Sequence, residues 1–103
     1  MNQQIFQEIQ TLKRQILPNE KVILYGSQAR GDARLDSDWD LLVLLNKEKR
    51  NFITDHDNFA YPFTELGFKY NTLINTKVYT IKDWETHPSN FRYNVEQDGI
   101  EII

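Results

Sequence analysis

The chain has 103 residues and a mass of 12.3 kDa, which is the size of one domain. Its composition is 40% hydrophobic, 13% aromatic and 26% charged, which excludes a disordered tail, a collagen-like fibre and a coiled-coil rod. With 15 acidic and 12 basic residues the formal net charge is −3, which argues against a dedicated nucleic-acid binder. The chain has no cysteine, so disulfides, thiolate catalysis and Cys-ligated zinc are excluded.

The sequence shows neither a targeting segment nor a membrane span. The N-terminus is polar and lacks the apolar core of a signal peptide. The longest apolar runs, residues 22–25 and 41–45, are far shorter than the roughly 20 residues of a membrane helix. We therefore expect a soluble, cytoplasmic protein with a single domain over residues 1–103.

The first half of the chain predicts one helix and two strands. Apolar residues recur at helical spacing over residues 2–17, and Pro18 ends the pattern. Residues 21–25 and 39–45 are short, dense apolar runs typical of buried strands. The polar stretch 27–36 between them predicts a turn, with one helical turn near residues 28–30.

A second helix is predicted over residues 49–66, with a kink or break at Pro62 and an end at Gly67. Its apolar stripe includes Phe52, Ile53 and His56, so His56 is expected in the core or an interface.

The remaining elements are a third strand, two short helices and a last strand. The strand is expected over residues 69–79, because Thr, Tyr, Ile and Val are frequent there. Thr80 is typical of a helix N-cap, and Ser89 or Asn90 could cap another helix. With a strand at 100–103, the order αββαβααβ predicts an α+β fold. We expect a small mixed or antiparallel sheet with helices packed on one side.

The candidate chemistry lies in the segment GSQARGDARLDSDWDLLVLL, residues 26–45. Asp38 and Asp40 open the second strand, and strand alternation places their side chains on one face, ~6.6 Å apart along the strand. Two carboxylates so placed can share Mg²⁺ or Mn²⁺, although acidic residues also occur at ordinary solvated strand starts.

Gly26 and Ser27 follow the first strand. Glycine allows a close backbone approach to a ligand, and a serine hydroxyl with adjacent amides can hold phosphate oxygens. The pair is equally common in ordinary turns.

Taken together, these residues resemble the signature of the polymerase-beta-like nucleotidyltransferases, and within them the small "minimal" nucleotidyltransferases. The later segments IKDWE and FRYNVEQDGIEI are also similar to the ends of such domains. The resemblance implies that Gly26 and Ser27 hold a nucleoside triphosphate. It implies that Asp38 and Asp40 are catalytic and bind two magnesium ions, with transfer of a nucleoside monophosphate to an acceptor hydroxyl.

Three neighbouring residues have two interpretations each. Arg30 could bind phosphate oxygens, or it could be a solvated charge or pair with Asp32 or Asp36. Arg34 is a weaker candidate for the same role. Ser37 could orient Asp38 or simply cap the backbone.

The chain departs from the family pattern at the third carboxylate expected on a later strand. No acidic residue occurs between Glu65 and Asp83, and the expected position falls on Asn71 or Thr72. Glu65 is the only acidic side chain that could take the place of the third carboxylate. If Glu65 does not reach the site, the chain has no third carboxylate there.

Two functions follow from the resemblance. The first is a metal-dependent nucleotidyltransferase that uses ATP and pairs with a small helical HEPN-type protein, as in toxin–antitoxin systems. The second is a catalytically weakened, nucleotide-binding antitoxin or regulatory module that acts by protein contact. A nucleic-acid-modifying enzyme is disfavoured by the negative charge.

Overall fold

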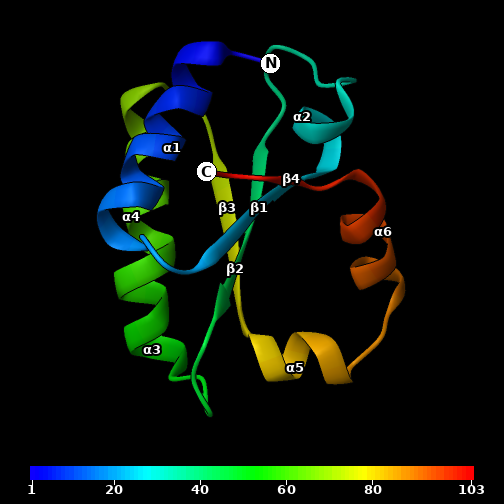
Figure 1. The fold of residues 1–103 in the computed structure, drawn as a ribbon. Helices are drawn as coiled ribbons and strands as arrows, with labels where there is room; N and C mark the ends of the chain where they lie inside the picture. The colour runs from blue at the N-terminus through cyan, green and yellow to red at the C-terminus, as the bar shows by residue number, and fades with distance from the viewer.

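The computed structural model describes residues 1–103 and contains one four-stranded sheet (Figure 1). Its strands are β1 (Lys21–Tyr25), β2 (Trp39–Leu45), β3 (Ile74–Thr80) and β4 (Ile100–Glu101), in the spatial order β3-β2-β1-β4. β1 is antiparallel to β2 and β4, whereas β2 and β3 are parallel. The expected α+β fold with a mixed sheet is confirmed.

Helices cover both faces of the sheet (Figure 1). α1 (Gln3–Ile16) and α4 (Tyr61–Lys69) pack on one face, over the larger apolar core. α5 (Ile81–Thr86) and α6 (Asn90–Asp98) contribute Trp84 and Val95 to a smaller core on the opposite face. The expectation of helices on one side is therefore wrong for α5 and α6. β2 explains the difference, because its continuous apolar run is buried on both faces.

The segment between β2 and β3 contains three helical pieces that follow one another without interruption. α3 (Phe52–Asp55) leads into a π-helical turn, η1 (His56–Ala60), and then into α4, which has Pro62 in its first turn. The predicted kink or break at Pro62 is not an interruption of the helix: residues 52–69 stay helical, and Pro62 falls in the first turn of α4, where a missing N–H is tolerated. The wider π turn shifts the helical phase. As a result Phe52 and Ile53 are 71% and 77% exposed, and His56 is exposed instead of buried.

The third strand begins later than predicted. Lys69 belongs to α4, and the chain turns through Asn71, which has a positive φ of 53°, before β3 starts at Ile74. Gly67 lies inside α4 and does not end it. A Cβ there would come within 2.6 Å of the Thr72 carbonyl oxygen, so the glycine permits a close approach between helix and turn.

The remaining sequence predictions concern the short elements. Thr80 caps α5 by accepting from the Asp83 N–H, and Ser89 caps α6 by accepting from the Arg92 N–H. Residues 26–30 form α2 (Gly26–Arg30), which includes the expected helical turn. None of the helices combines the length and apolar character that crossing a membrane requires.

Candidate functional site

Asp38 and Asp40 lie at the start of β2, on the sheet face covered by α5 and α6. Asp38 directly precedes the strand, and Asp40 is its second residue. Trp39 between them points into the larger core and is 2% exposed. The predicted alternation is therefore present, because burial of the indole fixes both carboxylates on the opposite face.

The Gly26 turn lies against Asp40. Tyr25, the last residue of β1, is paired with Asp40 in the antiparallel ladder, so the chain reverses into α2 beside this carboxylate. Gly26 has a φ of +75°, and a Cβ at this position would be 2.7 Å from Asp40 Oδ2. Only glycine fits both the backbone conformation and the space. Ser27 follows as the next residue of α2.

Arg30 ends α2, and its Nε lies 3.2 Å from Asp32 Oδ2. Of the interpretations of Arg30 given above, the structure therefore shows the ion pair, with Asp32 as the partner. Burial raises the pKa of the Asp40 carboxyl, and the positive charge of Arg30 opposes a small part of that rise. Ser37 Oγ accepts from the Arg34 N–H at 2.7 Å, which is the capping interpretation of the serine.

Asn75 occupies the position beside the carboxylates on β3. It is paired with Asp40 in the parallel ladder. Its Nδ2 lies 3.3 Å from Asp38 Oδ2 and 3.4 Å from Asp40 Oδ1. The expected placement at Asn71 or Thr72 is wrong, because both belong to the turn before the strand.

A third acidic group does not complete the pair. Glu65 is exposed on α4, whose packing is with the core of the opposite sheet face. No group of three or more Asp, Glu or His side chains is arranged to hold a metal ion. The donor set of this chain is thus two carboxylates with a neutral amide between them. This set fits Mg²⁺ or Mn²⁺, which bind through one or two carboxylates with substrate phosphates and water as the remaining ligands.

The environment of Asp40 disfavours its negative charge. Burial raises the pKa of Asp40 most strongly, and the neighbouring Asp38 raises it further. The hydrogen bond from Asn75 and the charges of Lys77 and Arg30 act in the opposite direction, but the pKa remains above its ordinary value. Burial, followed by the charge of Asp40, also raises the pKa of Tyr25 to about 12. A cation bound here would relieve this electrostatic cost.

Lys77 lies on the carboxylate face of β3, a placement that the sequence pattern did not indicate. Strand alternation places it on the same face as Asn75, and its Nζ lies 4.6 Å from the centroid of the Phe91 ring. The Phe91 ring packs edge-on against Tyr25 at 5.2 Å. The alternation of residues along INTKVYT could have placed Lys77 on this face, but only if β3 had been predicted to start at Ile74.

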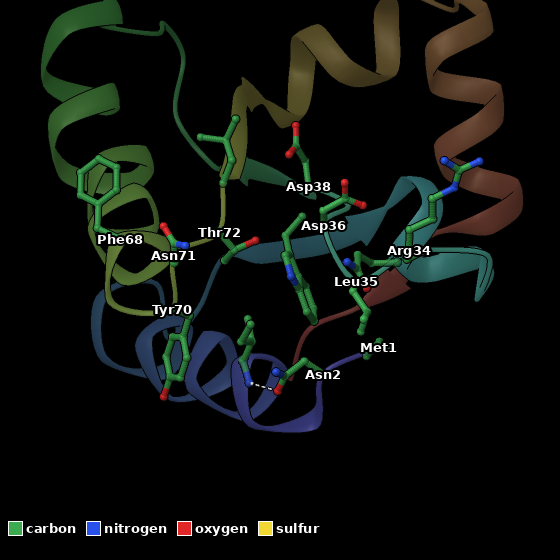
Figure 2. A pocket seen from close by; sticks show the side chains of 15 residues that line it. Met1, Asn2, Arg34, Leu35, Asp36, Asp38, Phe68, Tyr70, Asn71 and Thr72 are labelled. Carbon is green, nitrogen blue, oxygen red and sulfur yellow. Dashed lines mark hydrogen bonds between the residues drawn. The ribbon is translucent and has the colours of Figure 1, made fainter.

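A cavity of about 970 Å³ opens beside Asp38. Figure 2 shows Asp38 at its edge, with the loop before β2 and the turn before β3 forming its walls. Exposed Leu35, Phe68 and Leu73 give it an apolar rim. Asp38 is therefore reached from this cavity, whereas Asp40 faces the glycine turn.

The fold and the acidic pair define a nucleotidyltransferase-type domain, and comparison with known proteins agrees. Residues 7–103 match the family described as "Polymerase beta, Nucleotidyltransferase". A protein of Methanocaldococcus jannaschii named "Putative protein adenylyltransferase MJ0141" is 33% identical over 88 residues, which is 81% of this chain and 78% of that protein. The chain belongs to the polymerase beta nucleotidyltransferase family.

Two solved structures share the fold. One, described as a toxin-antitoxin with AMP-PNP, has a TM-score of 0.66 and 17% identity, with 100% of this chain and 73% of that chain covered. The other is the toxin-antitoxin MntA-HpeT in a mutant form, with a TM-score of 0.61 and 15% identity, covering 95% and 72%.

Proposed function

We propose that this protein is a metal-dependent nucleotidyltransferase that moves AMP from ATP to an acceptor hydroxyl. The observation that carries the proposal is the Asp38 and Asp40 pair on one sheet face, with the Asp40 carboxylate against the Gly26 turn. The choice of an adenine nucleotide is supported by the name of the 33% identical relative. It is also supported by the structural neighbour that is described as a toxin-antitoxin with AMP-PNP, an analogue of ATP.

Asp38 and Asp40 are the residues that would hold Mg²⁺ or Mn²⁺. When bound, such an ion offsets phosphate charge and favours loss of the acceptor proton. The backbone at Gly26 and the hydroxyl of Ser27 hold phosphate oxygens, and Arg30 can leave Asp32 to bind a phosphate through its fork of donors.

In the transfer, the acceptor oxygen forms a bond to the α-phosphorus. The bond from that phosphorus to the oxygen bridging to the β-phosphate breaks, and pyrophosphate leaves with the electron pair. The acceptor proton passes to Asp38, the carboxylate that borders the open cavity. Asn75 cannot take this proton, so the chain has fewer bases than three carboxylates would supply.

The proposed acceptor is a side-chain hydroxyl of a small helical HEPN-type partner, with this chain as its antitoxin. Both structural neighbours are described as toxin-antitoxin proteins, which supports a partner of that kind. The apolar rim of Leu35, Phe68 and Leu73 beside Asp38 offers a surface on which a protein acceptor can rest.

The test is incubation with ATP labelled at the α-phosphate, Mg²⁺ or Mn²⁺, and a small helical HEPN-type protein as the acceptor. The wild type is expected to label the partner, and the double variant Asp38→Asn/Asp40→Asn is expected to leave it unlabelled. Asp57→Asn, a change at an exposed carboxylate of η1, is the matched control and should label normally. Equal labelling by wild type and the double variant would contradict the proposal.

A second candidate is favoured by Asn75, which stands where a third carboxylate would. Under this alternative the chain binds a nucleotide and controls its partner by contact, without turnover. The double aspartate variant would then lose nucleotide binding and still neutralise the partner. Aspartate-dependent labelling of the partner would exclude this alternative.

A further inference from the structure

We propose that Lys77 is a phosphate-binding cation of the site and that, with the neutral Asn75 beside it, the chain holds one divalent ion per bound nucleotide. The resemblance to the family implies two ions, so this inference concerns how this chain departs from the pattern. It rests on the proposed nucleotide-binding function.

The position of Lys77 is defined by the sheet and by an aromatic support. In the parallel ladder Asn75 pairs with Asp40 and Lys77 pairs with Leu42, so both β3 side chains lie on the carboxylate face. The Lys77 Nζ lies 4.6 Å from the centre of the Phe91 ring. That ring contacts Tyr25, which is the ladder partner of Asp40 on the other side. The ammonium is therefore held beside the acidic pair on a ring that ties β1 to α6.

The charge of Lys77 is available to a ligand. Its side chain is exposed, and it takes part in none of the ion pairs within 4.0 Å. Burial raises the pKa of the Asp40 carboxyl, and the charge of Lys77 opposes part of that rise, so its field reaches the site. An ammonium that is exposed, unpaired and near a proposed phosphate site is suited to contact phosphate oxygens.

Asn75 removes the ligand that a second ion would need. Its amide nitrogen donates to both carboxylates, so a neutral donor occupies the space between them. No third acidic side chain joins the group. Compared with a site of three carboxylates, an amide and a nearby ammonium make this site two charges less negative. The affinity for a second divalent ion falls accordingly, and the ammonium offsets part of the phosphate charge instead.

Equilibrium dialysis with Mn²⁺ and AMP-PNP measures this directly, without any reaction. The excess of each ligand in the protein chamber gives the number of ions per bound nucleotide. The wild type is expected to bind one Mn²⁺ per AMP-PNP. Lys77→Met is expected to weaken AMP-PNP binding by about tenfold, and Lys77→Arg to restore most of it. Asn75→Asp/Lys77→Met restores a carboxylate and removes the ammonium, and it is expected to bind two Mn²⁺ per AMP-PNP.

Lys82→Met is the matched control, since Lys82 is an exposed lysine on α5 whose nearest acidic partner is 4.0 Å away. It should bind AMP-PNP as the wild type does. This inference, but not the proposed function, would be overturned by any one of three results. These are two Mn²⁺ per AMP-PNP in the wild type, one Mn²⁺ per AMP-PNP in Asn75→Asp/Lys77→Met, or unchanged AMP-PNP binding in Lys77→Met. Absence of any excess of either ligand would overturn the proposed function as well.

Discussion

Asn75 stands opposite Asp40 in the parallel ladder, and its Nδ2 lies within 3.4 Å of an oxygen of Asp40 and 3.3 Å of an oxygen of Asp38. One neutral donor therefore serves two carboxylates that repel each other. The hydrogen bond lowers the pKa of Asp40 but does not overcome the effect of burial. The acidic pair therefore lowers the stability of the fold when no ligand is bound.

Asp40→Asn should stabilise the ligand-free protein at pH 7. Because the pKa of Asp40 is raised in the folded state, that state binds more protons than the unfolded chain. The free energy of unfolding therefore falls as pH rises from the ordinary aspartate pKa through the raised value. We expect Asp40→Asn to raise Tm at pH 7 by a few degrees, with the advantage disappearing at acidic pH where Asp40 is protonated. Thermal unfolding followed by circular dichroism from pH 3 to 7 checks this; a lower Tm at pH 7 would contradict it.

Asn75→Ala should raise the pKa of Asp40 further. The substitution removes the hydrogen bond that favours the charged carboxylate and leaves burial and the charge of Asp38 unopposed by it. NMR titration of the side-chain carboxyl carbons measures the pKa directly. Lys82→Met changes a charge more remote from the pair and should leave the pKa of Asp40 where it is. A pKa in Asn75→Ala at or below that of the wild type would show that the amide does not hold the carboxylate in its charged form.

Gly26→Ala should cost both stability and ligand binding, whereas Gly31→Ala should cost stability alone. Both glycines have a positive φ, +75° and +84°, so alanine at either is strained by about 1–2 kcal/mol. A Cβ at Gly26 would also lie 2.7 Å from Asp40 Oδ2, whereas one at Gly31 meets nothing within 4 Å. Urea unfolding gives the stability of each variant, and Mn²⁺–AMP-PNP dialysis gives its binding. An equal loss of AMP-PNP binding in Gly26→Ala and Gly31→Ala would show that the close contact between Gly26 and Asp40 is not the cause of the loss.

The site at β2 could be predicted because its residues are close together in the sequence. Gly26 and Ser27 open α2 directly after β1, and Asp38 and Asp40 lie at the start of β2. Because β1 and β2 pair directly, sequence spacing brings the two groups close together. The predicted bounds of β1 and β2 are confirmed, because each strand is a short apolar run with clear ends in the sequence.

The contribution of β3 could not be predicted in the same way. Its register against β2 depends on where the strand begins, and that follows from Asn71 adopting a positive φ and from the continuation of α4 past Gly67. A shift of the start by a few residues changes which side chain faces Asp40. For this reason the sequence pattern indicates Asn71 or Thr72 for the position of the missing carboxylate, and it gives no indication of Lys77.

A change of helical phase explains why His56 is exposed where the sequence pattern predicts burial. The π turn η1 moved Asp55 to the inside and His56 to the outside, which helical periodicity from Phe52 onward does not anticipate. The side chain of Asp55 is 3% exposed and is bonded by the Lys47 ammonium at 2.6 Å and the Asn51 N–H at 2.8 Å.

This buried carboxylate carries the last prediction. Burial alone would raise the pKa of Asp55, but the hydrogen bonds from Lys47 and Asn51 and the nearby positive charges lower it overall. Its stabilising effect is therefore present above the ordinary aspartate pKa and is lost as pH falls through the lowered value. We expect Asp55→Asn to cost about 2–3 kcal/mol at pH 7, less than a fully buried pair would, because Lys47 is partly exposed. Urea unfolding at pH 7 and pH 3 measures the difference.

Asp57→Asn, a change at the exposed neighbour of Asp55, is the control for this prediction and should change stability by less than about 0.5 kcal/mol. A similar loss in both variants would contradict the assignment of Asp55 as the residue that fixes the loop after β2 to α3.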